Sequence, residues 1–286
     1  MAAAKVPDHL KFAPGHKFDG QFQIISGLGT GGAAIVYHAL DTLTHTQRAL
    51  KFPLNQRRED FDALRREMQV GKSVQHPNLC KTFDAKKAET GVIYGVMEYI
   101  AGENLLDVIN LRGRGQLADR FRWAIQLCAG LGYLHDATYV HGDLKLQNLM
   151  IDGTGNLKIT DFGQATHIGT SIGGGTWKYM APEQLVLDIP PDRLKAMPAL
   201  PESDMYAVGV ILYELFTGCA CLEGDTPLAI AASQKTLNDR PPSVVADVPD
   251  EISRAIMSCF QKDAGARPTA ELFRQHWKKV ADYFKT

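Results

Sequence analysis

Three polar side chains near the middle of the chain have the types and the spacing needed for chemistry at a phosphate. They are Asp143, Asn148 and Asp161, the last of which opens an Asp-Phe-Gly triplet. The Asp143 carboxylate can accept the proton of an attacking hydroxyl. Asn148 and Asp161 offer hard oxygen ligands, which Mg²⁺ between phosphates requires. The sequence therefore predicts a general base and two metal ligands for phosphoryl transfer.

The segment around the predicted base, residues 139–148, reads Tyr-Val-His-Gly-Asp-Leu-Lys-Leu-Gln-Asn. Together with Asp-Phe-Gly it closely resembles the catalytic and metal-binding loops of the eukaryotic-like (Hanks-type) serine/threonine protein kinases. One position departs from that pattern, because Gly142 stands where most members have Arg. The resemblance implies a bilobal α+β fold, with a small β-rich N-terminal lobe and a larger helical C-terminal lobe. It also implies ATP and Mg²⁺ as cofactors.

Residues 28–37 read Leu-Gly-Thr-Gly-Gly-Ala-Ala-Ile-Val-Tyr and resemble the glycine-rich loop of this family. Gly29 and Gly31 occupy its first two glycine positions, and Ala34 occupies the third. Glycine is needed where backbone N–H groups must approach phosphate oxygens and a Cβ would intrude. A hairpin turn has a similar composition, so the loop acquires weight only from the motifs that follow it.

Lys51 follows the glycine-rich segment at the distance expected for the family's Val-Ala-Ile-Lys strand, here Arg-Ala-Leu-Lys. A lysine there reaches the α- and β-phosphates as a point charge. It needs a carboxylate to orient it, and Glu67 fits because it lies in a segment, residues 60–73, with helical apolar periodicity. The alternative is an ordinary surface lysine and a solvated helix face. The register of four motifs favours the functional interpretation.

The resemblance further implies an adenine pocket at the segment that runs through Met97, Glu98 and Ile100. Met97 would be the gatekeeper, and the other two would present backbone hydrogen-bonding groups of the hinge. Glu103 is a candidate ribose contact. The residues predicted to contact the nucleotide are Leu28, Gly29, Gly31, Val36, Ala49, Lys51, Met97, Glu98, Ile100, Met150 and Asp161.

Further downstream, the chain has residues that resemble the family's structural supports. Ala-Pro-Glu, ending at Glu183, would close the activation segment. Asp204 resembles the aspartate that holds the catalytic loop from beneath, and Arg267 matches the arginine that pairs with Glu183. Breaking one side of a buried pair is costly, so a scaffolding role is expected for these residues.

Two residues indicate the acceptor. Lys145 lies two positions after the predicted base, where serine/threonine kinases carry a lysine that neutralises the transferring phosphoryl group. Thr176 matches the threonine that bonds the catalytic aspartate and lysine, although it could instead be a phosphorylation site. The sequence thus predicts transfer to Ser or Thr hydroxyls of a protein, including autophosphorylation. The predicted catalytic residues are Asp143, Lys145, Asn148, Lys51 and Glu67.

Gly142 affects the expected regulation. In most relatives, the Arg before the catalytic aspartate receives a phosphate from the activation loop and so orders that loop. This chain lacks that cation. We therefore expect activity to depend little on phosphorylation of Thr166, Thr170 or Ser171.

Two other functions share parts of this pattern. His-Gly-Asp also opens the catalytic loop of aminoglycoside and choline phosphotransferases, but Ala-Pro-Glu and Lys145 disfavour a small-molecule acceptor. A pseudokinase would have lost the lysine, the base or a metal ligand, and all are retained here. Gly71 leaves the second alternative open, because glycine inside a helix costs about 1 kcal/mol and could loosen the helix that carries Glu67.

Length and composition agree with one kinase domain over residues 1–286. We expect the N-lobe over about 18–98, the hinge over about 98–103 and the C-lobe over about 103–286. Long helices are expected near residues 118–136, 203–217, 251–261 and 269–284. The proline-rich residues 186–201 are expected to form an exposed insertion.

The formal net charge of −1 does not indicate a surface that binds nucleic acid or lipid headgroups. The longest apolar run is too short to span a bilayer, and the first residues lack the apolar core of a signal peptide. Five scattered cysteines argue against a disulfide framework. A cytoplasmic protein is therefore expected, acting on protein substrates, with a homodimer or a regulatory partner left open.

Overall fold

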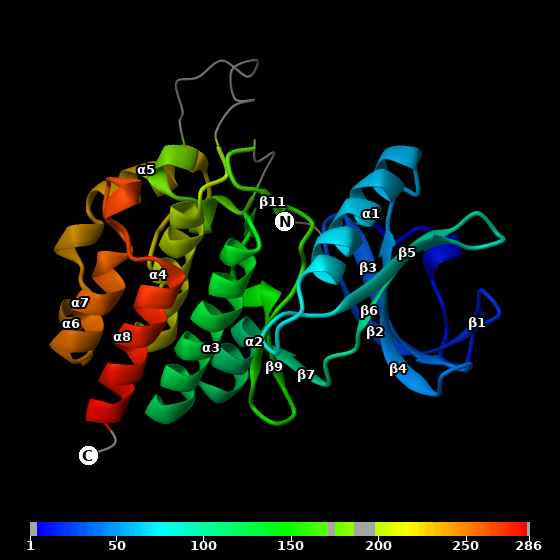
Figure 1. Ribbon diagram of the computed structural model, residues 1–286, viewed down its shortest axis with the longest axis horizontal. Coiled ribbons are helices and arrows are strands. Elements are labelled where there is room, and N and C mark those ends of the chain that lie inside the picture. Colours follow the sequence, from blue (N-terminus) through cyan, green and yellow to red (C-terminus); the bar gives the residue numbers. More distant parts are fainter. Residues whose placement is uncertain (1–4, 171–174, 186–197, 285–286) are drawn as a thin grey trace. The chain divides into compact units, whose positions relative to one another are not determined.

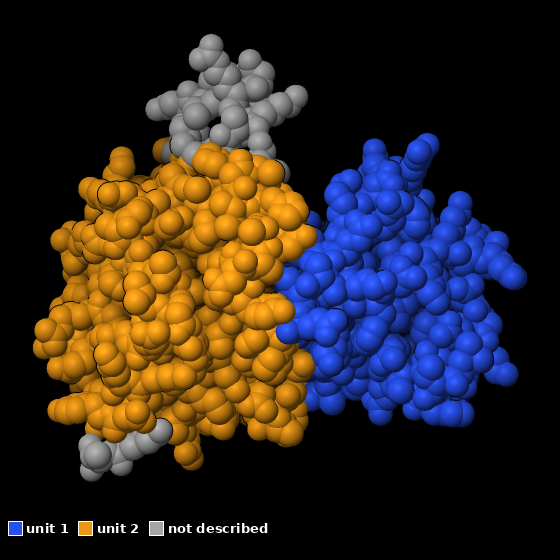
Figure 2. Space-filling model, in the orientation of Figure 1, with its two compact units in different colours: residues 1–75, 79–101, 161–163 blue, residues 76–78, 102–160, 164–286 orange. Residues whose placement is uncertain are grey.

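The structure is a computed structural model that describes residues 5–170, 175–185 and 198–284. It divides into two compact units, which Figure 2 colours separately. Unit 1 comprises Met1–Gln75, Leu79–Ala101 and Asp161–Gly163, and unit 2 comprises His76–Asn78, Gly102–Thr160 and Gln164–Thr286. Ser171 and most of the predicted insertion, residues 186–197, lie outside the described residues.

Unit 1 is built on one antiparallel sheet with strand order β1-β2-β3-β4-β6-β5. A short 3₁₀ helix, η1 (Asp8–Leu10), precedes the sheet, and helix α1 (Arg58–Ser73) packs on it (Figure 1). The strands are β1 (Lys17–Phe18), β2 (Phe22–Thr30), β3 (Ala34–Asp41), β4 (Thr46–Pro53), β5 (Thr82–Lys87) and β6 (Ile93–Glu98).

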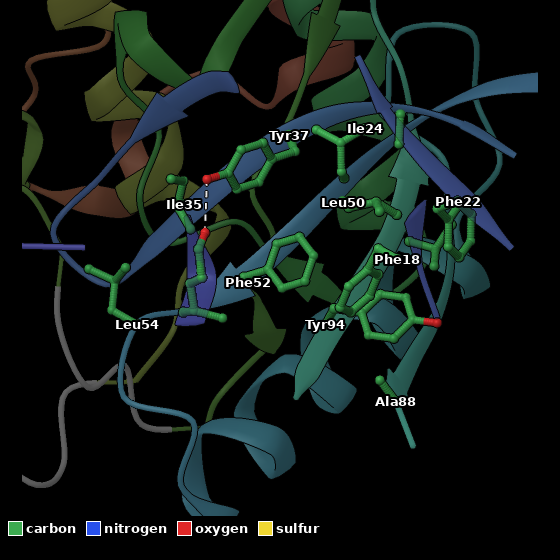
Figure 3. Close-up of a cluster of buried hydrophobic side chains, with 13 residues drawn as sticks. Phe18, Phe22, Ile24, Ile35, Tyr37, Leu50, Phe52, Leu54, Ala88 and Tyr94 are labelled. Carbon is green, nitrogen blue, oxygen red and sulfur yellow. Dashed lines mark hydrogen bonds between the residues drawn. The ribbon is translucent and has the colours of Figure 1, made fainter. Parts of the chain in front are cut away.

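The two faces of this sheet follow from the alternation of side chains along β3 and β4. Tyr37, Leu50 and Phe52 are buried in an aromatic-rich core on one face (Figure 3). The hydroxyl of Tyr37 donates to the carbonyl oxygen of Leu10 at 2.8 Å, which ties the N-terminal segment to this core. The residues that alternate with Tyr37, Leu50 and Phe52 along β3 and β4 therefore face the opposite side of the sheet. On that side, Lys51 lies directly across from Val36 in the register.

Helix α1 begins after Arg57, whose backbone N–H donates to the Asp60 carboxylate at 2.9 Å. This capping contact satisfies one of the amide donors at the helix start. Leu64 and Met68 pack with Ile93 of β6, and a Cβ on Gly95 would lie 3.1 Å from both helix side chains. Helix α1 therefore lies close to β6, and its residue Glu67 is buried.

Unit 2 is mainly helical. Its α-helices are α2 (Leu105–Arg112), α3 (Leu117–Asp136), α4 (Pro201–Thr217), α5 (Pro227–Lys235), α6 (Pro242–Val245), α7 (Asp250–Ser258) and α8 (Ala270–Tyr283). Its strands are β7 (Gly102–Asn104), β8 (Tyr139–Val140), β9 (Leu149–Asp152), β10 (Leu157–Ile159) and β11 (Thr166–His167). Short 3₁₀ turns are η2 (Leu146–Asn148), η3 (Trp177–Tyr179), η4 (Pro182–Gln184), η6 (Leu237–Asp239) and η7 (Ala264–Ala266).

Helix α4 forms the centre of unit 2, and it is buried without interruption from Ser203 to Tyr213. A helix that is apolar all round must be covered on every side. Pro201 occupies its first turn, where a missing N–H costs nothing, and Gly218 ends it with φ of 73°. The expected start at residue 203 was two positions late.

Helices α3 and α8 pack against each other and agree with the expected bounds to within one residue. Helix α7 is shorter than expected, because it ends at Ser258 and not at residue 261. The amides of Cys259 and Phe260 bond back in a turn to Ile256 and Met257, at 3.1 Å each. This turn brings the Phe260 ring against Tyr206 at 5.1 Å, so tertiary packing overrides the helical periodicity. Among the described residues, no helix is long and apolar enough to cross a membrane.

Candidate active site

Lys51 is the centre of an ion-pair network within unit 1. Its Nζ lies 2.7 and 2.8 Å from the two carboxylate oxygens of Glu67 and 2.9 Å from Oδ1 of Asp161. Lys51 comes from β4, Glu67 from α1 and Asp161 from the Asp-Phe-Gly segment, so three separate elements meet at one ammonium group. The structure thus brings together the lysine and carboxylate that the sequence predicted as partners.

The two carboxylates stabilise the ammonium of Lys51, whereas burial and the Asp161 carboxylate raise the pKa of Glu67. Burial disfavours the ammonium of Lys51, but attraction to Glu67 and Asp161 outweighs burial and raises the pKa of Lys51 above its ordinary value. The side chain of Glu67 is almost fully buried, whereas that of Asp161 is 42% exposed. Lys51 therefore remains a cation that is held in place, with a partly exposed carboxylate beside it.

Asp161 has an unusual backbone conformation, with φ of 64°. A residue other than glycine in the left-handed region stores strain, and such residues cluster at functional sites. The Oδ1 atom of Asp161 also lies 3.4 Å from the N–H of Gly163, within the same turn. The turn therefore fixes the direction of the carboxylate that was predicted to bind metal.

Three of the residues predicted to line the adenine pocket, Val36, Ala49 and Met97, share the sheet face of Lys51. Ala49 pairs with Met97 across β4 and β6, and Val36 lies across from Lys51. Met97 is half-buried and packs against the cluster of Leu64, Met68 and Ile93. The predicted hinge residues Glu98, at the end of β6, and Ile100, two positions later, are also half-buried. Leu28 on β2 is 47% exposed. Met150 lies on β9 of unit 2.

The glycine-rich loop runs from the end of β2 into the start of β3 and has room at its glycines. Among the described residues, no atom lies within 4 Å of the position a Cβ would take on Gly29 or Gly32. For Gly31 the nearest such atom is the carbonyl oxygen of Ala34, at 3.8 Å. None of the three has a left-handed backbone. Protein packing therefore does not explain the glycines, and the open space is what a bound phosphate would need.

A second network lies within unit 2, around Asp143. Lys145 Nζ is 2.5 Å from Oδ2 of Asp143 and 3.1 Å from Oγ1 of Thr176. Thr176 donates to Oδ1 of Asp143 twice, from its backbone N–H at 2.9 Å and from its hydroxyl at 2.8 Å. The structure thus brings together the predicted base, the predicted substrate lysine and the threonine of the activation segment.

Asn148 is buried in the same unit, and its amide nitrogen donates to the carbonyl oxygen of Asp143 at 2.8 Å. This bond fixes the side-chain amide, so the amide oxygen is the atom it can offer to a cation. Asn148 and Asp161 both present oxygen, the ligand type that suits Mg²⁺. Asn148 belongs to unit 2 and Asp161 to unit 1, and their pairing around a metal stays a prediction.

Asp204 on α4 supports the loop that carries Asp143. Its Oδ2 accepts the backbone N–H of His141 at 2.8 Å and lies 2.9 Å from Nε2 of His135, while its Oδ1 accepts the N–H of Gly142 at 3.0 Å. Gly142 has φ of 77°, a left-handed conformation that glycine adopts without strain. The left-handed backbone therefore explains why glycine suits position 142, and the lack of a cation there is a separate consequence of the same residue. Sequence reasoning missed His135, because nothing in the sequence pattern pairs it with Asp204.

The expected pair of Arg267 and Glu183 is present as a bidentate contact, with distances of 2.7 and 2.8 Å. Arg267 is buried, and it also donates to the backbone carbonyl of Gln261 at 2.9 Å. Burial raises the pKa of Glu183, but the hydrogen bonds and charge of Arg267, together with hydrogen bonds from the backbone and from Ser203, outweigh burial and leave that pKa below its ordinary value. In contrast, Glu103 pairs with Arg112 at 2.8 Å, a partner that the predicted ribose contact did not anticipate.

Comparison with known proteins identifies the family. Residues 22–277 match the family model for the protein kinase domain, which is most of the chain. The chain belongs to the protein kinase family. Each of the two networks described above holds residues that the sequence predicted for a kinase active site, and their role in catalysis stays a prediction. Family membership also carries the α+β bilobal fold and, in general terms, the use of ATP with a divalent metal.

The relatives that this kinase domain resembles include bacterial serine/threonine-protein kinases. It is 31% identical to serine/threonine-protein kinase PrkC of Bacillus subtilis over 87% of this chain and 38% of that protein. It is 32% identical to the probable serine/threonine-protein kinase PknB of Corynebacterium glutamicum, over 80% of this chain and 36% of that protein. The PknB of Mycolicibacterium smegmatis is 29% identical over 94% of this chain and 45% of its own length. The chain thus spans less than half the length of each of these relatives.

Proposed function

We propose that this chain transfers the γ-phosphoryl group of ATP to Ser or Thr hydroxyls of proteins, including its own. The observation that carries the proposal is the contact of Lys145 and Thr176 with the carboxylate of Asp143, at 2.5 and 2.8 Å. A base whose two oxygens are both held has a fixed direction, and such preorganisation is the main contribution a kinase can make. The names of the relatives, all serine/threonine-protein kinases, support the same acceptor.

The residues divide the chemistry among them. Asp143 would orient the acceptor hydroxyl and take its proton while the new O–P bond forms. The bond between the γ-phosphorus and the β,γ-bridging oxygen breaks, and ADP leaves with the electron pair. Lys145 would neutralise charge on the transferring group, and Lys51 would hold the α- and β-phosphates. Loss of any one of these charged groups is expected to cost on the order of 10²-fold in rate.

The donor set fits the nucleotide and its metal. The open space at Gly29 can admit phosphate oxygens, and Asn148 and Asp161 would hold Mg²⁺. When bound, Mg²⁺ would neutralise charge on the β- and γ-phosphates. We propose contacts from the other predicted residues, namely Leu28, Gly31, Val36, Ala49, Met97, Glu98, Ile100 and Met150. Glu67 would act by holding Lys51.

The proposed function also includes domain boundaries and a cellular location. We propose that residues 1–286 form one kinase domain, with the N-lobe over about 18–98, the hinge over about 98–103 and the C-lobe from about 103. A cytoplasmic location, protein substrates and a homodimer or a regulatory partner remain predictions from the sequence.

The test is incubation with radiolabelled ATP and Mg²⁺, with generic protein substrates and aminoglycosides offered side by side. We expect label on Ser or Thr of protein, and none in the Asp143→Ala variant, which should still bind ATP. Near-normal transfer by Asp143→Ala would contradict the assignment of the base. Label on aminoglycosides alone would favour a small-molecule kinase. ATP binding without transfer would favour a pseudokinase.

A further inference from the structure

The activation segment, which leads from Asp161 toward Thr176, is held by main-chain hydrogen bonds at a point where its backbone turns. The N–H of Gly169 donates to the carbonyl oxygen of Ala199 at 2.9 Å, and the N–H of Ala199 donates to the carbonyl oxygen of Thr170 at 2.7 Å. Ala199 is fully buried, and all three residues belong to unit 2. We name this reciprocal pairing the Ala199 latch.

The sequence on both sides of the latch suits this pairing. Gly169 has φ of 81°, a left-handed conformation, and no described atom lies within 4 Å of the position of a Cβ on it. Glycine is therefore needed there for its backbone conformation and not for close packing. On the other side, Leu200 precedes Pro201 and is extended, with φ of −118° and ψ of 134°, as expected for a residue before proline. Pro198 and Pro201 have no N–H, and the donor of the latch is the N–H of Ala199 between them.

The latch connects the activation segment to the helix that supports the proposed base. Two residues after Ala199, α4 begins at Pro201. In the first turn of α4, Asp204 accepts the N–H groups of His141 and Gly142 at 2.8 and 3.0 Å. The start of α4 therefore holds two parts of the site, the loop that carries the base through Asp204 and the activation segment through Ala199.

The described contacts of residues 166–170 are hydrogen bonds between main-chain groups, hydroxyls and one imidazole. Strand β11 pairs with β8, and the N–H of Ile168 donates to the carbonyl oxygen of Thr138 at 3.0 Å. The hydroxyl of Thr170 donates to the carbonyl oxygen of His167 at 2.6 Å. Among the residues that the structure describes, no Lys or Arg side chain bonds to this stretch. The segment is therefore held there without the cation that a phosphate would need.

We propose that Ala199 and Gly169 are positioning residues, whose latch orders the activation segment without a phosphate. The inference rests on the proposed phosphoryl transfer, because it states how the same site is regulated. Thr176 follows Thr170 by six positions, so the latch shortens the length of chain that must be ordered before Thr176 can hold Asp143. The latch uses main-chain atoms, so it does not depend on the Thr170 hydroxyl. Simple packing of a buried alanine would stabilise the fold without any specific effect on this segment.

Substitutions at Gly169 test the turn. The space around it is open, so the variants differ mainly in how well they tolerate a positive φ. Valine is β-branched and strained there, which is worth about a factor of ten in an equilibrium, and asparagine adopts this conformation more readily. We expect about a tenfold loss of kcat in Gly169→Val and a kcat within about threefold of wild type in Gly169→Asn. Equal kcat values in the two variants would overturn the proposal.

Gly113→Val is the matched control, because Gly113 also lies in unit 2, has φ of 72° and has no described atom within 4 Å of a Cβ. Denaturant unfolding should show a loss of stability similar to that of Gly169→Val, while kcat stays unchanged. An equal loss of kcat in both would assign the effect to strain alone and overturn the proposal.

Ala199→Pro covers the case in which Gly169→Val does not fold. It removes the N–H that bonds to Thr170, and we expect about a tenfold loss of kcat. The KM for ATP should stay unchanged, because the latch contacts none of the residues proposed to bind the nucleotide. A kcat equal to that of wild type in folded Ala199→Pro would contradict the positioning role.

Hydrogen exchange gives a readout that does not depend on catalysis. In phosphatase-treated wild type, the amides of Gly169 and Ala199 should exchange slowly, as measured by mass spectrometry on the fragments that contain them. Exchange should become about tenfold faster in Gly169→Val and stay slow in Gly169→Asn and Gly113→Val. In Ala199→Pro, the Gly169 amide is read alone and should exchange faster. Fast exchange of both amides in the treated wild type would overturn the latch.

The same measurements separate this inference from the proposed function. If the wild type transfers no phosphate, the proposed function fails, and hydrogen exchange still decides whether the latch holds the segment. If the wild type transfers phosphate but loses more than about tenfold of its kcat on phosphatase treatment, a phosphate orders the segment. In that case the inference fails while the proposed function stands.

Discussion

Thr176 donates two hydrogen bonds to a single carboxylate oxygen of Asp143, one from its backbone and one from its hydroxyl. The other oxygen of Asp143 is held by Lys145 at 2.5 Å, and Lys145 also donates to the Thr176 hydroxyl. The three side chains thus fix one another. The direction of the proposed base therefore depends on a residue of the activation segment, and its hydroxyl can be removed without touching the base itself.

We predict that Thr176→Val lowers kcat by about 10- to 100-fold, because a hydrogen bond to a charged group is worth about 1.5–3 kcal/mol. The KM for ATP should change little, since Thr176 contacts the proposed base and not the residues proposed to bind nucleotide. Initial rates of phosphate transfer to a protein substrate give both constants. Thr176→Ser, which keeps the hydroxyl, should stay close to wild type. A normal kcat in Thr176→Val would show that the backbone N–H alone orients Asp143.

The second prediction concerns stability. Arg267 is buried and makes both of its contacts to Glu183 through the guanidinium fork. Arg267→Ala would leave the carboxylate without its counter-charge in a half-buried site, and removing one partner of a buried pair costs about 3–5 kcal/mol. Denaturant unfolding measures this cost. Arg254→Ala is the matched control, because its pair with Glu251 is exposed and should matter little. Similar losses in the two variants would contradict the buried role of Arg267.

The same pair predicts a dependence on pH. The pKa of Glu183 is lower in the folded chain than its ordinary value of 4.5. The unfolded chain therefore takes up the proton first as the pH falls. The stability that this group contributes is complete above about pH 4.5 and is lost as the pH falls through the lower, folded pKa.

Because other carboxylates such as Asp41 and Asp152 also have lowered pKa values, the measurement is a difference. We expect the unfolding free energy of the wild type to fall more steeply with acid than that of Glu183→Gln. Parallel acid limbs in the two proteins would show that the pair contributes no net linkage.

Much of the site could be predicted because it depends on spacing along the chain. The distance from the glycine-rich loop to Lys51, and the helical periodicity around Glu67, were enough to predict a pair that the structure contains. Gly71 in α1 lies against Thr82 in β5, where a Cβ on the glycine would be 2.6 Å from the threonine side chain. This contact could not be predicted in this way. It depends on a bulge at Phe83 and on how closely a helix approaches a strand, and neither leaves a pattern in the sequence. The glycine was therefore interpreted as a weakness of the helix.

Glu103 and the end of α7 show the same limit. A carboxylate near the hinge can bind a ribose or an arginine, and its pairing with Arg112 depends on the packing of α2. Helix α7 ends early because Phe260 finds a buried position against Tyr206, which no local propensity encodes. Local patterns predict the elements, and the contacts between elements decide their ends.

The last prediction concerns activation. Gly142 provides no cation, and its N–H is already bonded to Asp204 at 3.0 Å. Thr166 and Thr170 bond each other at 2.6 Å, and Thr170 also donates to the carbonyl oxygen of His167. Within the described part of the chain, neither hydroxyl is bonded to a Lys or Arg side chain.

We therefore predict that replacing Thr166, Thr170 and Ser171 together with Ala leaves kcat within about threefold of wild type. The reason is that the residue directly before Asp143 is Gly142 and not an arginine that could receive a phosphate and order the loop. Steady-state rates of the triple variant, compared with those of wild type before and after phosphatase treatment, would measure the change, with Asp143→Ala as the inactive reference. A hundred-fold loss of kcat in a properly folded triple variant would mean that a phosphate on this loop pairs with another cation. In that case Gly142 would have changed the partner of the phosphate without removing the need for one.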